Sequence, residues 1–136
     1  RKTLPGLRAF EKYAVRIGGG STHRYGLDDA ILIKDNHIAV AGGVREAIRA
    51  GKAFAGHLVK VECEVISLDQ LREALEERPD VILLDNMSPE LLEKAVKITN
   101  GAVILEASGG ISLDTIKAVE VRERAMHLME AKLRLA

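Results

Sequence analysis

The stretch LVKVECEVISLDQLREALEERPDVILLD, residues 58–85, decides the fold class of this chain. It begins with a valine-rich apolar run (58–65), continues with leucines at helical spacing (68–78), and ends with the apolar run VILLD (81–85). Short runs of Val, Ile and Leu are typical of strands that are buried on both faces. A strand, a helix and a second strand in this order predict a parallel pair with a right-handed crossover.

The same alternation continues on both sides of this stretch. Two further apolar runs predict strands, and two further amphipathic segments predict helices: AILIKD (30–35) and AVILEA (102–107) for the strands, VREAIRAG (44–51) and PELLEKAVKITNG (89–101) for the helices. Strands that alternate with helices indicate an α/β fold with a parallel sheet. The pattern alone leaves two architectures open, a barrel and an open doubly wound sheet.

Residues that favour helix ends flank the predicted helices. Ser67, with Gln70 three residues later, has the spacing of a capping box. Ser88 precedes Pro89, and proline is favoured at the first helical position. Gly51 and Gly101 are expected to end the helices at 44–51 and 89–101 in the left-handed conformation. These signals predict where the helices begin and end.

Composition places the chain among ordinary globular domains. Of its 136 residues, 47% are hydrophobic, 29% are charged and only 3% are aromatic. No apolar run approaches the ~18 residues of a membrane span, and no signal-peptide pattern opens the chain. The single cysteine, Cys63, excludes an internal disulfide and fits a reducing compartment. We therefore expect a cytoplasmic protein that does not enter a membrane.

Charge is distributed unevenly although the net charge is zero. Residues 1–60 contain 11 of the 20 Lys and Arg residues and 5 of the 20 Asp and Glu residues. Residues 61–136 contain the other 9 basic and 15 acidic residues. Basic groups near glycines suit a small anionic ligand, and later acidic groups suit a metal or a cationic centre. Nucleic acid is a poorer fit, because few aromatic residues accompany the basic ones.

Polar side chains end the predicted strands one after another: Lys34–Asp35, Glu64, Asp85–Asn86 and Glu106. Parallel α/β folds bind ligands at the carboxyl ends of their strands, where these side chains would converge. Each could alternatively cap the turn that follows it, but the repetition favours a site. Alternation also places Glu62 and Glu64 on one face of their strand and Cys63 on the other. Lys34 needs a partner, either a carboxylate such as Asp35 or Glu64, or a bound anion.

Three glycine-containing segments could bind anions. RKTLPGLR (1–8) joins cations to a Pro-Gly turn, and GGGSTHRYGL (18–27) joins His23 and Arg24 to three glycines. A solvated basic terminus, a flexible linker and a structural histidine are the plain alternatives. ASGG (107–110) follows a predicted strand, where free backbone N–H groups can hold a phosphate.

Taken together and in order, these segments closely resemble the quinolinate phosphoribosyltransferase family, also called carboxylating nicotinate-nucleotide pyrophosphorylases. The matching strings are RKTLPGLR, EKYAV, GGGSTHRYGL, ILIKDNH, VECEV, ILLDNMSPE and ILEASGGI, within residues 1–118. The resemblance implies an incomplete TIM-type α/β barrel with about four to five parallel strands in this chain. It also implies an N-terminal α/β sandwich domain in the family, which we expect this chain to lack.

The resemblance further implies a reaction and a set of site residues. Family members combine quinolinate with phosphoribosyl pyrophosphate, in the presence of Mg²⁺, and release pyrophosphate and CO₂ with nicotinate mononucleotide for NAD synthesis. It assigns catalytic roles to Lys34, Glu64 and Asp85, and Mg²⁺ contacts to the two acids. Those three residues also bind substrate, together with Arg1, Lys2, His23, Arg24, Ser108, Gly109 and Gly110.

The end of the chain departs from the family pattern. Val119, Met126, Met129 and Leu133 recur at helical spacing, so residues 119–136 are predicted to form one amphipathic helix. An incomplete barrel has two open edges, which predicts a dimer or a larger homo-oligomer. Two alternative functions stay open: a related phosphoribosyltransferase for another aromatic acid, and a barrel fragment without turnover that still binds anions.

Overall fold

The computed structural model describes residues 2–110 and 126–128 of the chain. Its residues divide into two compact units, an N-terminal unit (Arg1–Ala30) and a sheet unit (Ile31–Ala136).

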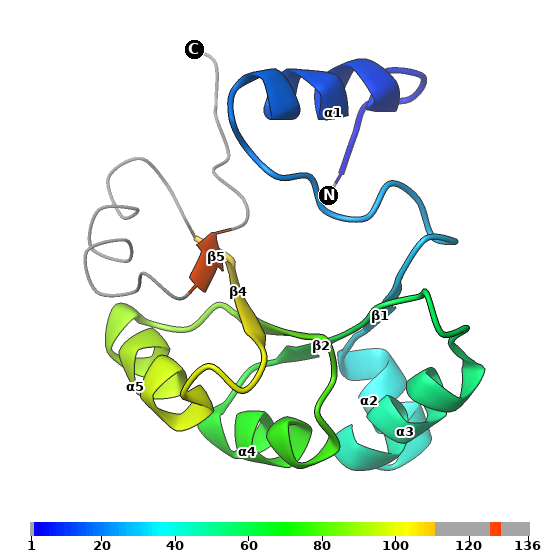
Figure 1. Ribbon diagram of the computed structural model, residues 1–136. Helices are drawn as coiled ribbons and strands as arrows, with labels where there is room; N and C mark the ends of the chain where they lie inside the picture. Colours follow the sequence, from blue (N-terminus) through cyan, green and yellow to red (C-terminus); the bar gives the residue numbers. More distant parts are fainter. Residues whose placement is uncertain (1, 111–125, 129–136) are drawn as a thin grey trace. The chain divides into compact units, whose positions relative to one another are not determined.

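The sheet unit is built on parallel strands in sequential order, β1-β2-β3-β4-β5 (Figure 1). The strands are β1 Ile31–Ile33, β2 Val61–Val65, β3 Val81–Asp85, β4 Ile104–Ser108 and β5 Met126–Leu128. Each strand therefore pairs with the next one along the chain. A doubly wound sheet reverses its strand order at a switch point, whereas a barrel does not. The observed order selects the barrel between the two architectures that the sequence left open.

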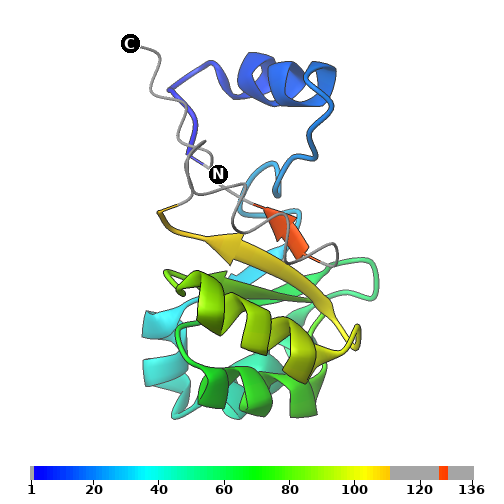
Figure 2. The same ribbon diagram turned by 90° about the vertical axis from the view of Figure 1, so that its left-hand side faces the viewer.

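The helices of the sheet unit all lie on one face of the sheet (Figures 1 and 2). They are α2 Asp35–Ala41, α3 Val44–Phe54, α4 Leu68–Glu77 and α5 Pro89–Thr99. One-sided helices are what a barrel requires, because its helices form an outer ring around the strands. None of the helices in the described residues is long and apolar enough to span a membrane.

Alternate strand residues pack against these helices and form the core. Ile33, Cys63, Ile82 and Leu105 belong to a buried cluster with helix residues that include Leu71. Cys63, Leu71 and Ile82 are fully buried. Burial of this kind contributes roughly 1.5–3 kcal/mol per large side chain, and it fixes the relative positions of strands and helices in this unit.

The other face of the sheet carries polar side chains. Parallel register pairs Glu64 with Leu83, and Leu83 with Glu106, so these residues lie on the same face. Glu62 lies on this face as well, two residues before Glu64. Cys63 points to the helix-covered face and is buried in the core. The predicted alternation of Glu62, Cys63 and Glu64 is thus confirmed.

Two of the predicted helix starts are confirmed and one predicted helix end is wrong. The Ser67 hydroxyl accepts a hydrogen bond from the Gln70 backbone N–H at 3.2 Å. The Ser88 hydroxyl accepts one from the Leu91 N–H at 3.4 Å. Gly51 does not end its helix, because α3 continues to Phe54. A Cβ added at Gly51 would lie 3.0 Å from Ile33 Cδ1, so this glycine allows α3 to approach β1.

The helix predicted for residues 119–136 is wrong at Met126–Leu128, which form strand β5. Leu105 pairs with Met126, and Ala107 with Leu128. A short apolar run fits either a helix or a strand by its period alone. The edge of β4 offers unpaired N–H and C=O groups, and pairing with them favours the strand. Residues 111–125 and 129–136, which contain the rest of that prediction, lie outside the described residues.

The N-terminal unit contains helix α1, Arg8–Ile17, which the sequence pattern did not predict. A turn precedes it, in which the Leu7 N–H donates to the Leu4 carbonyl at 3.1 Å and Gly6 has a φ of 76°. No residue of α1 is buried, and Phe10 is 72% exposed. Among residues 2–30, therefore, no apolar residue is buried, in contrast to the core of the sheet unit.

Candidate active site

Lys34 and Glu64 lie together at the carboxyl ends of β1 and β2. Lys34 follows the last residue of β1, and its Nζ lies 3.9 Å from Glu64 Oε2. The Lys34 side chain is 40% exposed and that of Glu64 is 12% exposed. Glu64 is thus the acidic partner of Lys34, one of the two that the sequence left open. The ammonium remains accessible, and 3.9 Å is too long for a hydrogen bond.

The segment after Lys34 begins helix α2 rather than continuing the strand. The Lys34 backbone N–H donates to His37 Nδ1 at 2.9 Å, and the Asn36 N–H donates to Asp35 Oδ1 at 2.7 Å. Both side chains therefore accept hydrogen bonds from backbone groups of the first turn, as capping residues do. His37 thus holds the backbone N–H of Lys34, and Asp35 holds that of Asn36, so the first turn of α2 fixes the backbone from which the Lys34 side chain extends.

Asp85 and Ser108 lie side by side at the ends of β3 and β4. The Asn86 N–H donates to the Ser108 carbonyl at 2.8 Å, and Asn86 Nδ2 donates to Asp85 Oδ2 at 2.7 Å. Gly109 and Gly110 have φ values of 88° and 68°. A Cβ added at Gly109 would overlap the Asn86 amide oxygen. The Ser-Gly-Gly turn thus depends on glycine both for its conformation and for its contact with Asn86.

Further carboxylates lie on the same face of the sheet. Glu62 is 8% exposed and Glu106 is half-buried, and one carboxylate oxygen of each lies within 4.8 Å of the other. These acids and Glu64 make the polar face of the sheet acidic, which suits a cationic centre or a hard metal ion. On the opposite face, burial and then the nearby Glu64 and Glu62 raise the pKa of the Cys63 thiol to about 12. That thiol is therefore unsuited to nucleophilic chemistry.

In the N-terminal unit, a lysine of α1 holds the backbone of the predicted residues His23 and Arg24. Lys12 Nζ donates to the carbonyls of both residues, at 2.9 Å in each case. Arg24 Nη1 donates to the Ala30 carbonyl at 2.8 Å. His23 and Arg24 are both half-buried. The loop that carries them is thus fixed through its backbone, and one edge of the Arg24 guanidinium is already engaged.

Asp29 holds the next two residues of the same loop. Its carboxylate accepts hydrogen bonds from the backbone N–H groups of Tyr25 and Gly26, the latter at 2.8 Å. These hydrogen bonds lower the pKa of Asp29 from its ordinary value. The sequence pattern missed both Lys12 and Asp29. Lys12 is separated from its partners by 11 and 12 residues, so no local spacing could reveal it.

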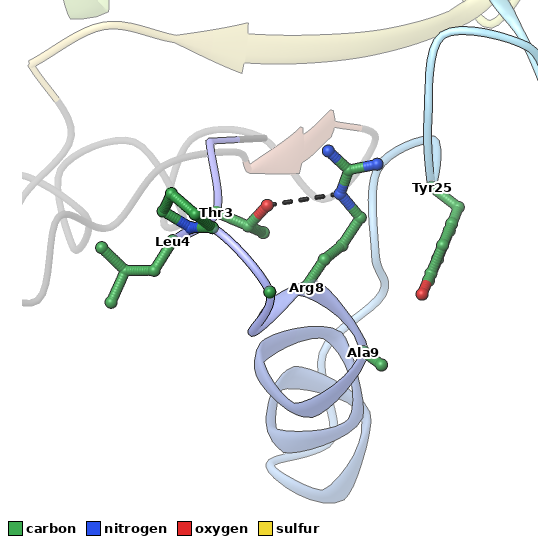
Figure 3. A pocket seen from close by; sticks show the side chains of 7 residues that line it. Thr3, Leu4, Arg8, Ala9 and Tyr25 are labelled. Carbon is green, nitrogen blue, oxygen red and sulfur yellow. Dashed lines mark hydrogen bonds between the residues drawn. The ribbon is translucent and has the colours of Figure 1, made fainter.

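A pocket of about 430 Å³ lies within the N-terminal unit (Figure 3). In Figure 3 the Arg8 guanidinium lies between the Thr3 hydroxyl and the Tyr25 ring. Arg8 Nε donates to Thr3 Oγ1 at 3.3 Å, and Arg8 Cζ lies 5.9 Å from the centre of the Tyr25 ring. The predicted residue Lys2 is exposed, and Arg1 lies outside the described residues. The pocket is lined by Thr3, Leu4, Pro5, Gly6, Arg8, Ala9 and Tyr25.

Comparison with known proteins decides the family. The family model described as quinolinate phosphoribosyl transferase, C-terminal domain, matches residues 1–128. The chain belongs to this family. The match includes β5, so it extends ten residues past the resemblance that the sequence showed within 1–118.

Curated relatives carry names that agree with this family. A protein of Methanocaldococcus jannaschii named probable carboxylating nicotinate-nucleotide pyrophosphorylase is 56% identical over 123 residues, covering 85% of this chain and 43% of the relative. The human carboxylating nicotinate-nucleotide pyrophosphorylase is 44% identical over 119 residues, covering 85% and 40%. The chain thus spans less than half the length of these relatives.

Solved structures show the same fold in this family. The nicotinate-nucleotide pyrophosphorylase of Francisella tularensis matches with a TM-score of 0.89 and 44% identity, over 96% of this chain and 46% of that one. The structure of NadC from Streptococcus pyogenes matches with a TM-score of 0.87 and 45% identity, over 96% and 46%. The parallel sheet described above is therefore a barrel segment of the kind found in these enzymes.

Proposed function

We propose that this chain acts in the transfer of a phosphoribosyl group from phosphoribosyl pyrophosphate to quinolinate. The bond from the ribose to pyrophosphate breaks and a bond to the pyridine nitrogen forms. One carboxyl group leaves as CO₂, and a proton takes its place on the ring carbon. The products are nicotinate mononucleotide and pyrophosphate, which places the reaction in NAD biosynthesis. The observation that carries the proposal is the family match over residues 1–128, which contain every predicted site residue.

The acid substrate is proposed to bind to the basic residues of the N-terminal unit. Quinolinate is a dianion, and Arg1, Lys2, His23 and Arg24 offer cationic or donor groups of the required kind. Arg24 has five N–H donors and uses Nη1 on the Ala30 carbonyl. Its other N–H groups suit a carboxylate, and the bond to Ala30 fixes the plane in which they lie.

The phosphoribosyl donor is proposed to bind to residues of the sheet unit. Lys34 keeps an accessible ammonium 3.9 Å from Glu64, which suits contact with pyrophosphate oxygens. Glu64 and Asp85 would stabilise the positive charge that builds on the ribose as pyrophosphate leaves. Ser108, Gly109 and Gly110 would bind phosphate through a hydroxyl and backbone N–H groups, since the left-handed glycines allow close approach.

Magnesium is proposed to accompany the pyrophosphate. Glu64 and Asp85 lie on one face of neighbouring strands and supply carboxylate oxygens, the ligands that Mg²⁺ prefers. This donor set fits the ion. When bound, Mg²⁺ would neutralise charge on the pyrophosphate, while Lys34 and the two carboxylates orient the donor.

The oligomeric state and the cellular location of the protein are also proposals. β1 and β5 are the outer strands of the described sheet, and outer strands favour association with another protein surface. We propose a homodimer or a larger homo-oligomer. A cytoplasmic location is supported by the single buried cysteine, Cys63, and by the metabolic role of the proposed product.

A product assay tests the proposal. The chain is incubated with quinolinate, phosphoribosyl pyrophosphate and Mg²⁺, and nicotinate mononucleotide is measured by mass spectrometry. We expect product from the wild-type chain and a loss of at least about 100-fold in Arg24→Ala and Lys34→Ala, because each removes a charged group that positions a substrate. Lys97→Ala is the matched control, since Lys97 is an exposed lysine that pairs with Glu93 on α5.

The wild-type result decides between the open alternatives. Absence of product, with folding confirmed by circular dichroism, would remove the turnover proposal for this chain. Quinolinate binding without product would instead support an anion-binding fragment. Product with another aromatic acid, and none with quinolinate, would support the related phosphoribosyltransferase.

A further inference from the structure

Lys12 makes contacts that its surface position on α1 does not require. Lys12 is half-buried, and its ammonium donates to two consecutive carbonyls, those of His23 and Arg24, at 2.9 Å each. A surface lysine usually extends into water and gains little from one partner. Here the side chain contacts the backbone of two predicted substrate-binding residues, which lie 11 and 12 residues later in the sequence.

The rest of the loop is held in a complementary way. Asp29 accepts hydrogen bonds from the N–H groups of Tyr25 and Gly26. The Tyr25 ring has Lys12 Nζ 5.9 Å from its centre, within the range of a cation–π contact. The loop is therefore fixed by a cation at the carbonyl groups of residues 23 and 24 and by a carboxylate at the N–H groups of residues 25 and 26. The side chains of His23 and Arg24 contribute nothing to these backbone bonds.

We propose that Lys12 is a positioning residue for the acid substrate, and this inference rests on the function proposed above. By holding the two carbonyls, Lys12 fixes the backbone from which the His23 and Arg24 side chains extend. Arg24 then donates from Nη1 to the Ala30 carbonyl, and its other nitrogens are presented to the acid substrate. A displacement of about 1 Å in such a group can reduce binding or rate by about 100-fold. Lys12 acts through the backbone, so its removal affects the acid and leaves the phosphate groups of the donor unaffected.

Two substitutions separate positioning from general stability. Lys12→Met keeps most of the aliphatic stem but removes the donors, whereas Lys12→Arg keeps a cation with several N–H groups. Lys97→Met is the matched control, because Lys97 is an exposed lysine that donates to Glu93. Binding of quinolinate and of pyrophosphate to each chain is measured by isothermal titration calorimetry.

The expected result is selective. Lys12→Met weakens quinolinate binding by about tenfold to 100-fold, Lys12→Arg restores part of it, and Lys97→Met leaves it unchanged. Pyrophosphate binding stays the same in all variants. Unchanged quinolinate binding in Lys12→Met would overturn the inference and leave the proposed function intact, and so would an equal loss for both ligands, since that indicates a general loss of structure.

Amide hydrogen exchange of Tyr25 and Gly26 distinguishes failure of the inference from failure of the proposed function. Their N–H groups donate to Asp29, and Lys12 binds the carbonyls of the two preceding residues. If Lys12 holds the loop, Lys12→Met speeds their exchange by at least about tenfold, whereas core amides of the sheet unit keep their rates. If the wild-type chain does not bind quinolinate, the proposed function fails for this chain, and unchanged exchange in Lys12→Met would overturn the inference separately.

Discussion

The sheet unit and the N-terminal unit hold their candidate site residues by different forces. In the sheet unit, Leu71 and Ile82 are fully buried, and strand register fixes Glu64 and Asp85. In the N-terminal unit, Phe10 is 72% exposed and no residue of α1 is buried. Its loop is held instead by charged side chains on backbone groups, chiefly Lys12 and Asp29.

Because of this difference, the candidate site residues of the two units should respond differently to substitution. A buried core is cooperative, so a substitution there lowers the stability of the whole sheet unit without moving one site residue selectively. Hydrogen bonds from single charged groups are local, so one substitution in the N-terminal unit can displace His23 and Arg24 while the sheet unit stays folded. Four further changes test this contrast.

The largest expected effect is a loss of core packing. Leu71→Ala should lower the free energy of unfolding by about 2–5 kcal/mol, because it removes a fully buried side chain and leaves a cavity. Phe10→Ala, the matched change in α1, should alter it by less than about 0.5 kcal/mol. Urea unfolding followed by circular dichroism measures both. Equal losses would show that α1 is packed as tightly as the sheet unit and would contradict the described difference between the two units.

The next effect concerns the turn after β4. Gly109→Ala should cost more than about 1 kcal/mol in the free energy of unfolding, because alanine is strained at this positive φ. The added Cβ also overlaps the Asn86 side chain. Asn86→Gly in the same chain should recover part of the loss by removing that overlap. Thermal unfolding of the single and double variants measures the coupling, and strictly additive losses would exclude the predicted contact.

Helix capping gives a smaller effect. Ser67→Ala should destabilise the sheet unit by about 1 kcal/mol, because it removes the acceptor for the Gln70 N–H at the start of α4. Ser88→Ala should cost less, since its hydrogen bond to the Leu91 N–H is longer, 3.4 Å against 3.2 Å. Urea midpoints of the two variants provide the comparison. The reverse order would show that hydrogen-bond length does not rank these caps.

The smallest effect is a dependence on pH in the N-terminal unit. Hydrogen bonds from Tyr25 and Gly26 lower the pKa of Asp29 in the folded state. A lowered folded-state pKa contributes stability that is fully present above the unfolded value and is lost as the pH falls through the folded value. The loop should therefore loosen at acid pH below the ordinary aspartate range. NMR titration of the Asp29 carboxyl measures its midpoint, and Asp29→Asn should abolish the acid-dependent change in the Tyr25 amide signal. A midpoint at or above the ordinary value would contradict the described hydrogen bonds.

Sequence patterns predicted the sheet unit well because its elements are repetitive. Apolar strands, leucine spacing and the serine caps at Ser67 and Ser88 all report local structure, and the structure confirms them. The strand Met126–Leu128 was missed because its partner is the edge of β4, which a helical period cannot reveal. Gly51 was misjudged because its small size serves a contact with Ile33 and not a helix end.

The candidate site was predictable where side chains follow strands. Lys34, Glu64 and Asp85 stand at strand ends in the sequence, and the structure places Lys34 beside Glu64. Their chemical roles remain predictions. Lys12 and Asp29 could not be found in this way, because they act on backbone groups of a loop that has no periodic pattern. Long-range polar contacts of this kind are set by the folded structure and leave no spacing in the sequence.

The stoichiometry of the released products tests whether the chain couples phosphoribosyl transfer to decarboxylation of quinolinate. Quinolinate carrying a ¹³C label in its carboxyl groups is incubated with the chain, phosphoribosyl pyrophosphate and Mg²⁺, and labelled CO₂ and pyrophosphate are counted in the same sample. We expect equal amounts of the two, dependent on both substrates. Pyrophosphate without CO₂, or neither product from a folded chain, would contradict it.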